Sequence, residues 1–125
     1  MKSRQKLIVQ EPEPYWYPGF YRELNGKQIE LIPIDDPESV SPRIHPEDQV
    51  ILWSVLHQNP GEQVRQILSL QNRHPNLAVI ILAPATMHSL KWVFYELQML
   101  AVLDPQIPLM NGVKLCQRYW KSLIS

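Results

Sequence analysis

The segment LAVIILA, at Leu77–Ala83, decides the fold class of this 125-residue chain. It is an unbroken apolar run rich in β-branched side chains, which is typical of a parallel strand inside a sheet covered on both faces. Weaker apolar runs also favour strands, at Lys6–Val9, Ile29–Ile34, Gln49–Val55 and Leu100–Asp104. The sequence therefore predicts further strands on both sides of Leu77–Ala83 along the chain.

Helical patterns separate these strands. The clearest covers Thr86–Met99, and the last begins at Pro108. In each helix the apolar side chains recur on one face: Phe20, Tyr21 and Leu24; Val64, Ile67 and Leu68; Leu90, Val93, Phe94 and Leu97; and Leu109, Val113, Cys116, Trp120 and Leu123. Residues 37–48 are rich in proline, and no helix is predicted there. Because strand and helix alternate, we expect an α/β domain with a doubly wound parallel sheet.

Composition limits the classes of function. The chain has 12 basic and 12 acidic residues and a net charge of +0, which argues against a surface for nucleic acid or anionic membranes. No apolar run approaches the ~20 residues that span a bilayer. The single cysteine, Cys116, excludes an internal disulfide and a cysteine-rich metal site. We expect one cytoplasmic domain, residues 1–125, that binds neither nucleic acid nor membrane.

Four segments follow one another in an order that matches a known family: LIVQEPEP at residues 7–14, VILWSVLHQNPGEQVRQILSL at residues 50–70, LAVIILAPAT at residues 77–86, and residues 94–123. This order resembles the receiver domain of two-component response regulators, the flavodoxin-like CheY fold. Pro60–Gly61 after the third strand and Pro105 after the fifth add to the resemblance. It implies a five-stranded parallel sheet of order 2-1-3-4-5, with a second helix that is short or missing.

The resemblance also implies a phosphorylation site at the strand ends. In receivers, acidic residues after the first strand hold Mg²⁺, and an aspartate after the third accepts the phosphoryl group. A Thr or Ser after the fourth strand and a Lys after the fifth contact that group, because its developing charge must be neutralised. The matched positions here are Gln10 and Glu11, then Trp53 or Ser54, then Ala83, and last Asp104. An aspartyl phosphate cannot form without the aspartate.

We therefore expect a degenerate receiver that cannot be phosphorylated and serves as a protein-interaction module in bacterial signal transduction. It is expected not to be an enzyme and to need no cofactor or metal. Other loop acids leave an alternative open: Glu13, Asp35 and Asp36 could join Asp104 to hold a divalent cation. We favour solvated loop acids, because Asp35–Asp36–Pro37 is typical of a turn.

A rival hypothesis from another class is a small-molecule-sensing or enzymatic α/β domain. It would use the crevice at the carboxyl ends of the strands, with Glu11, Ser54, His88 and Asp104 as its site. The segment LWSVL lacks the glycines of a nucleophile elbow. The histidines show no metal-ligand spacing.

Exposed aromatic residues indicate a contact surface. Trp92, Tyr95 and Met99 lie off the apolar face of helix Thr86–Met99, and Tyr119 lies off that of the last helix. In receivers, the face formed by the fourth helix, fifth strand and fifth helix is the usual surface for dimers and partners. We expect a protein partner or a homodimer there; a wide apolar arc that seals a small core is the alternative. The consecutive residues 15–17 (YWY) either pack over the sheet or anchor a partner.

Overall fold

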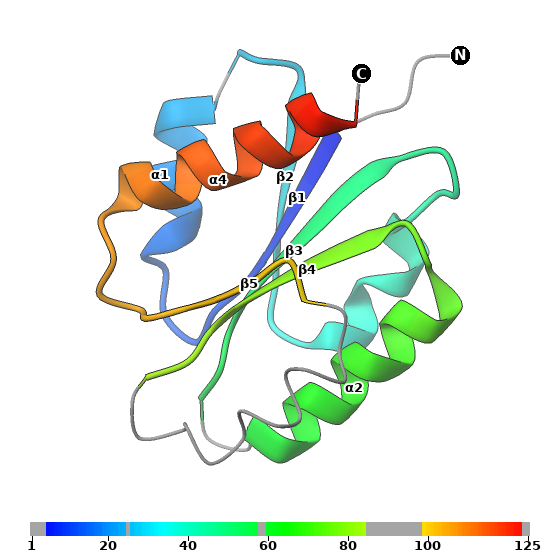
Figure 1. Cartoon of the computed structure of the whole chain (residues 1–125). Helices are drawn as coiled ribbons and strands as arrows, with labels where there is room; N and C mark the ends of the chain where they lie inside the picture. Colours follow the sequence, from blue (N-terminus) through cyan, green and yellow to red (C-terminus); the bar gives the residue numbers. More distant parts are fainter. Residues whose placement is uncertain (1–4, 25, 58–59, 85–98, 124–125) are drawn as a thin grey trace.

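The computed structural model describes residues 5–24, 26–57, 60–84 and 99–123. Along the chain these form the following elements (Figure 1): β1 (Gln5–Gln10), α1 (Trp16–Leu24), β2 (Ile29–Ile34), the 3₁₀ turns η1 (Pro37–Ser39) and η2 (Ser41–Arg43), β3 (Gln49–Val55), α2 (Pro60–Arg73), β4 (Leu77–Leu82), β5 (Ala101–Leu103) and α4 (Leu109–Ser122). Most of the helix predicted at Thr86–Met99 lies outside the described residues. Its last residue, Met99, is described and lies outside any helix.

The described strands form one five-stranded parallel sheet in the order β2-β1-β3-β4-β5. This confirms the predicted fold class and strand order. β1 lies between β2 and β3, with Gln10 paired to Ile34 on one side and to Ser54 on the other. Gln10 and Ser54 therefore lie side by side near the carboxyl end of the sheet.

Helices cover both faces of the sheet (Figure 1). α1 and α4 lie together on one face, and α2 lies on the other with the 3₁₀ turns. Because side chains alternate along a strand, each face has its own apolar core. Trp53 belongs to the α1/α4 core, and its neighbour Leu52 belongs to the α2 core. α4 approaches the sheet closely at Gly112, where an added Cβ would lie 2.7 Å from the Trp53 ring.

The proline-rich segment Pro37–Asp48 replaces a second helix, as predicted. Its described backbone makes only the short turns η1 and η2. A buried ion pair fixes the end of the segment: Lys6 Nζ lies 2.8 Å from Asp48 Oδ2 and donates a 2.8 Å hydrogen bond to the Arg43 carbonyl. Asn76 adds a 3.0 Å hydrogen bond to the Asp48 carbonyl. Non-local polar contacts therefore hold a segment that has no regular structure of its own.

Some predicted details were wrong. Tyr21, Leu68 and Leu123, predicted on the apolar faces of their helices, are 52%, 37% and 44% exposed. The face that α2 buries instead carries Gln63, Val64, Ile67 and Leu70, because Gln63 has polar partners inside the domain. β5 is shorter than predicted, covering Ala101–Leu103. In the described part of the chain, no helix has the length and apolar character required to cross a membrane.

Candidate functional site

Three neutral polar side chains meet at the carboxyl ends of β1 and β3. Ser54 Oγ donates a 2.7 Å hydrogen bond to Gln10 Oε1, and Gln63 Nε2 of α2 donates to the same Oε1 at 3.0 Å. Gln63 Nε2 also lies 2.9 Å from Ser54 Oγ and 3.0 Å from the Val55 carbonyl. Gln10, Ser54 and Gln63, here called the polar network, are all buried, at 1%, 0% and 5% exposure.

Fixed partners determine the orientation of each amide in the polar network. Gln63 Nε2 must face the Val55 carbonyl, which can only accept, and Gln63 Oε1 accepts from the His57 N–H at 3.4 Å. Gln10 Nε2 likewise donates to the Asp35 carbonyl at 3.4 Å. Because each donor faces an acceptor, the network satisfies its buried polar groups without any charge.

The structure places Trp53 and Ser54 on opposite faces of β3. Trp53 is fully buried and packs against Trp16 and Phe20, with ring centroids 4.9 Å away in each case. Its indole N–H has no hydrogen-bond partner among the described residues and lies among these aromatic rings. Of the two candidates for the phospho-acceptor position, Ser54 is therefore the one that faces Gln10.

Two other positions of the expected site lie outside the polar network. Ala83 is buried, and its backbone N–H donates a 2.9 Å hydrogen bond to the Leu103 carbonyl. Its methyl side chain has no hydroxyl to offer a phosphoryl group. Asp104 is exposed, and its Oδ1 accepts the Gln106 N–H at 2.8 Å. The Asp104 carboxylate thus stabilises the turn that follows β5.

Glu11 caps helix α1. Its Oε1 accepts the backbone N–H groups of Tyr15 and Trp16 at 3.0 and 2.9 Å, and its Oε2 accepts that of Tyr17 at 2.9 Å. The next residue, Pro18, has no N–H. Glu11 therefore satisfies the amide donors of the first turn, which have no partner inside the helix, and its negative charge is favourable at this end of the helix dipole.

The remaining loop acids do not assemble a metal site among the described residues. Asp35 and Asp36 line a shallow depression of about 240 Å³ beside Gln10 and α2, with His57 and Glu62. Glu13 lines a different depression. Within the described ranges, no group of three or more His, Cys, Asp or Glu side chains is placed to hold a metal ion.

The site of the rival enzymatic hypothesis is not assembled from the described residues. Ser54 is fully buried, and its hydroxyl donates to Gln10 rather than to a base. His57 turns its Nδ1 toward the Val55 carbonyl at 3.2 Å. His88, the histidine expected in that site, lies outside the described residues.

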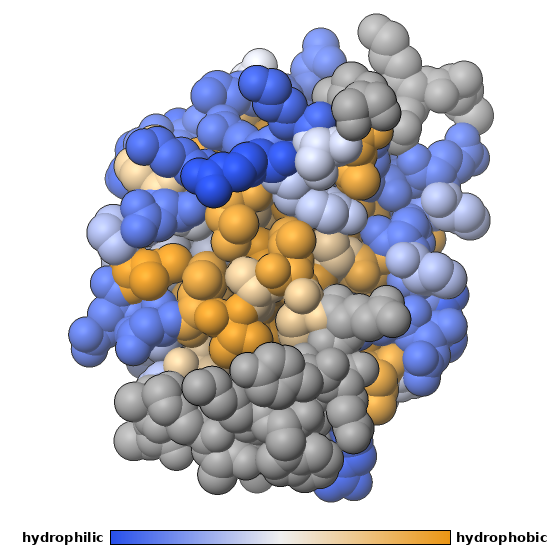
Figure 2. Space-filling model, viewed as in Figure 1, coloured by the Kyte–Doolittle hydropathy of each residue, from blue (hydrophilic) through white to orange (hydrophobic). Residues whose placement is uncertain are grey.

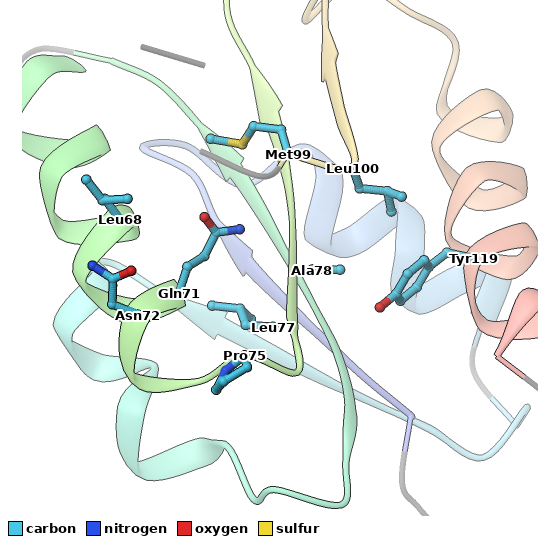
Figure 3. Close-up of a pocket in the computed structure, with 9 residues that line it drawn as sticks. All are labelled: Leu68, Gln71, Asn72, Pro75, Leu77, Ala78, Met99, Leu100 and Tyr119. Atoms are coloured by element: carbon cyan, nitrogen blue, oxygen red, sulfur yellow. The ribbon is translucent and has the colours of Figure 1, made fainter. Parts of the chain in front are cut away.

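Two of the residues predicted to form a contact surface, Met99 and Tyr119, are described, and both lie near β5. Figure 3 shows a depression there, of about 450 Å³, between α2 and α4. We call it the edge depression; it is lined by Leu68, Gln71, Asn72, Pro75, Leu77, Ala78, Met99, Leu100 and Tyr119. Tyr119 lies on its α4 side, and burial raises the pKa of its phenol above the ordinary value. Met99 is half-buried against the α2 core, whereas Trp92 and Tyr95 lie outside the described residues.

Gln63 was not predicted to be a site residue. Gln63, Ile67 and Leu70 follow one another at helical spacing on the buried face of α2. A polar residue that continues an apolar stripe is the signal that could have identified it, because a buried amide needs partners inside the domain. Gln10 lies 53 positions away in sequence, and Ser54, nine positions away, belongs to a different element, so the identity of both partners required the fold.

Comparison with known proteins identifies the fold. No family model matches the chain, and no curated protein matches its sequence. A response regulator receiver domain protein from Clostridium thermocellum has a similar structure, with a TM-score of 0.74, 11% identity and coverage of 97% of this chain and 99% of that one. A CheY-like protein, TadZ, from Pseudomonas aeruginosa gives 0.72 at 13% identity, covering 92% and 98%. The chemotaxis response regulator CheY4 of Vibrio cholerae gives 0.68 at 13%, covering 93% and 98%. The chain therefore has a receiver-like fold.

Proposed function

We propose that this chain is a receiver-like domain that cannot be phosphorylated and that acts as a protein-interaction module in bacterial signal transduction, within the cytoplasm. One observation carries the first half of the proposal. Ser54, which faces Gln10 at the strand ends, is fully buried, and its hydroxyl both donates to Gln10 and lies within hydrogen-bond distance of Gln63 Nε2. A phosphodonor cannot reach this hydroxyl without breaking the polar network.

The chemistry around Ser54 supports the same conclusion. Phosphoryl transfer needs cations or oriented donors that stabilise the charge developing on the phosphoryl oxygens. The group that most closely faces Ser54 is instead the carbonyl oxygen of the Gln10 amide. Glu11 is engaged by three backbone N–H groups of α1. Asp104 adds negative charge where the resemblance requires a lysine, and like charge disfavours a phosphate there.

The second half of the proposal concerns the β5 edge. The two edges of the sheet differ: β2 carries an exposed charge at Glu30 and an exposed proline at Pro33, both of which discourage pairing with another chain. β5 carries neither, and Val102 is 42% exposed. Figure 2 shows apolar side chains gathered over this side of the molecule, and Leu100 there is 37% exposed. Such a patch is typical of a protein contact surface.

Exposure to a small phosphodonor tests the first half. The purified chain is incubated with acetyl phosphate and Mg²⁺, and its intact mass is measured. A receiver that has an aspartate at the matched position, treated in parallel, is the positive control. We expect a phosphoryl adduct on the control only. An acid-stable or acid-labile adduct on this chain would contradict the proposal, and peptide mapping would identify the residue that carries it.

A charge placed on the β5 edge tests the second half. Val102→Lys is expected to weaken self-association or partner capture, because a lysine on an edge strand opposes close apolar contact. Glu30→Lys introduces the same side chain on the opposite edge and is the matched control. Sedimentation and pull-down measure both variants. Equal behaviour of the two would show that the contact surface lies elsewhere.

A further inference from the structure

The depression that Glu13 lines, separate from the β5 edge, lies at the carboxyl ends of β1 and β3. It has a volume of about 330 Å³, at the lower end of the ~300–1,000 Å³ typical of ligand pockets. We call it the aromatic depression; its lining includes Glu11, Glu13, Tyr15, Trp16, Val55 and Pro105. The polar network does not line it, because the side chains of Gln10 and Ser54 point toward Gln63 of α2 instead.

Its wall is an exposed tyrosine held on a buried tryptophan. Tyr15 is 60% exposed, and its ring meets Trp16 edge to face, with centroids 5.1 Å apart and planes at 88°. Trp16 is only 3% exposed and packs in turn against Trp53. Prolines at positions 12 and 14 restrict the loop before this pair. Binding to such a surface costs little conformational entropy, since the aromatic wall is already in place.

The acidic residues that line the depression determine which ligand charge is favoured. Glu11 and Glu13 line it, and among its described lining residues none is basic. Asp104 directly precedes Pro105 and is exposed. A cation is therefore favoured over an anion. The described acids do not form a group that could hold a metal ion, which favours an organic cation that also makes apolar contacts.

From this combination we propose that the aromatic depression binds an arginine side chain of a protein partner. A guanidinium stacks on an aromatic face and pairs with a carboxylate in a planar, bidentate geometry. Tyr15 supplies the ring and Glu13 the exposed carboxylate. The inference rests on the proposed interaction role and specifies the chemistry of the partner, but it does not involve the β5 edge.

A peptide titration tests the proposal. The probe is acetyl-Ala-Ala-Arg-Ala-Ala-amide, added at low ionic strength while amide and indole signals are followed by NMR. We expect saturable shifts at Tyr15, at Trp16 and at Gln106, which follows Pro105. The same peptide with citrulline in place of arginine is the matched control, since citrulline keeps the shape and loses the charge. We expect no saturable shifts with it.

Paired variants define the contacts. Tyr15→Ala is expected to weaken peptide binding about tenfold and Glu13→Gln about two- to fivefold. Tyr21→Ala and Glu47→Gln change an exposed tyrosine and an exposed glutamate elsewhere, and both are expected to bind like the parent chain.

Three results would overturn the inference: equal shifts with the citrulline peptide, arginine-dependent shifts confined to other surfaces, or saturable Mg²⁺ shifts at these residues without any peptide response. The comparison of Val102→Lys with Glu30→Lys separates this failure from that of the proposed interaction role. If the chain does not bind the peptide but Val102→Lys still weakens self-association or partner capture, only the arginine site is lost.

Discussion

The two ends of the sheet bury different kinds of polar side chain: charged ones at the amino end and uncharged ones at the carboxyl end. At the amino end, Lys6 and Asp48 form an ion pair 2.8 Å long, with both side chains less than a tenth exposed. At the carboxyl end, Gln10, Ser54 and Gln63 are equally buried and carry no charge. The resemblance to receivers places charged chemistry at the carboxyl end. In this chain the buried charges lie at the amino end instead, where Lys6 and Asp48 hold the segment Pro37–Asp48 in place.

The two ends are therefore expected to respond differently to mutation and to pH. A buried ion pair is sensitive to the loss of either partner, because the remaining charge is left in a poorly solvating interior. The polar network has no ionised member, so neither binding nor loss of a proton near neutral pH changes its charge. This fits a domain that is held in one state.

Removal of one charge at the amino end is expected to have the largest effect. Lys6→Met leaves the Asp48 carboxylate buried without its cation and should lower the free energy of unfolding by about 3–5 kcal/mol. The double variant Lys6→Met/Asp48→Leu should lose clearly less, because no charge remains to be buried. Urea unfolding of the three chains measures this. If the double variant loses as much as the single one, the ion pair does not explain the effect.

Introduction of a charge at the carboxyl end is expected to rank second. Ser54→Asp places a carboxylate against Gln10 Oε1 and should cost about 2–4 kcal/mol at about pH 7. Burial raises the pKa of such a carboxyl group, so the protonated form is favoured in the folded chain, and the loss should grow as pH rises. Ser54→Ala, which removes a hydrogen bond without adding charge, should cost about 1–2 kcal/mol.

Unfolding of both Ser54 variants at several pH values, each relative to the parent chain, separates the two effects. A loss for Ser54→Asp that does not depend on pH would show that this end accommodates an ionised carboxylate. The neutral polar network would then not exclude charged groups from this end of the sheet.

The core between the ends provides a third test. Burial raises the pKa of the Cys116 thiol from 9.0 to about 12. Between these values the unfolded chain releases a proton that the folded chain retains, so stability falls as pH rises, by up to about 1.4 kcal/mol per pH unit. The fall should be measurable from pH 9 to 10 and should be much smaller in Cys116→Ala, where the weaker contribution of Tyr119, whose pKa burial also raises, remains. An equal pH dependence in both chains would assign it to other groups.

The smallest effect is expected at Glu11, the charged residue that contacts α1 at the carboxyl end. Glu11→Gln keeps one acceptor oxygen for the first turn of α1 and loses the charge that interacts with the helix dipole. The expected loss is about 1 kcal/mol by urea unfolding. Glu47→Gln, at an exposed loop position, should change stability very little. A loss that grows in saturating Mg²⁺ would instead indicate a cation site at Glu11, because the cation would stabilise only the parent chain.

The strands were predictable because their apolar runs are local and nearly continuous. Leu77–Leu82 is buried at every position, as expected for a strand covered on both faces. The strand order came from the family resemblance, since the sequence pattern alone gives no pairing. The missing second helix was visible in the prolines of residues 37–48.

The contacts of the site were less predictable, because they join distant positions. Gln10, Ser54 and Gln63 meet only through the register of β1 with β3 and the placement of α2. The choice between Trp53 and Ser54 depended on which face of β3 each occupies. Glu11 matches an acidic position of receivers in sequence, but its hydrogen bonds to the first turn of α1 were not predicted.

An NMR titration shows whether the carboxyl end of the sheet can hold a phosphoryl group. Amide shifts are recorded as Mg²⁺ is added, and then as beryllofluoride, a phosphoryl mimic, is added with Mg²⁺. We expect no saturable shifts at Gln10, Glu11, Ser54 or Asp104. Saturable shifts at these residues that extend to Val102 and Tyr119 would contradict it, because they would show a working phosphoryl site coupled to the β5 edge.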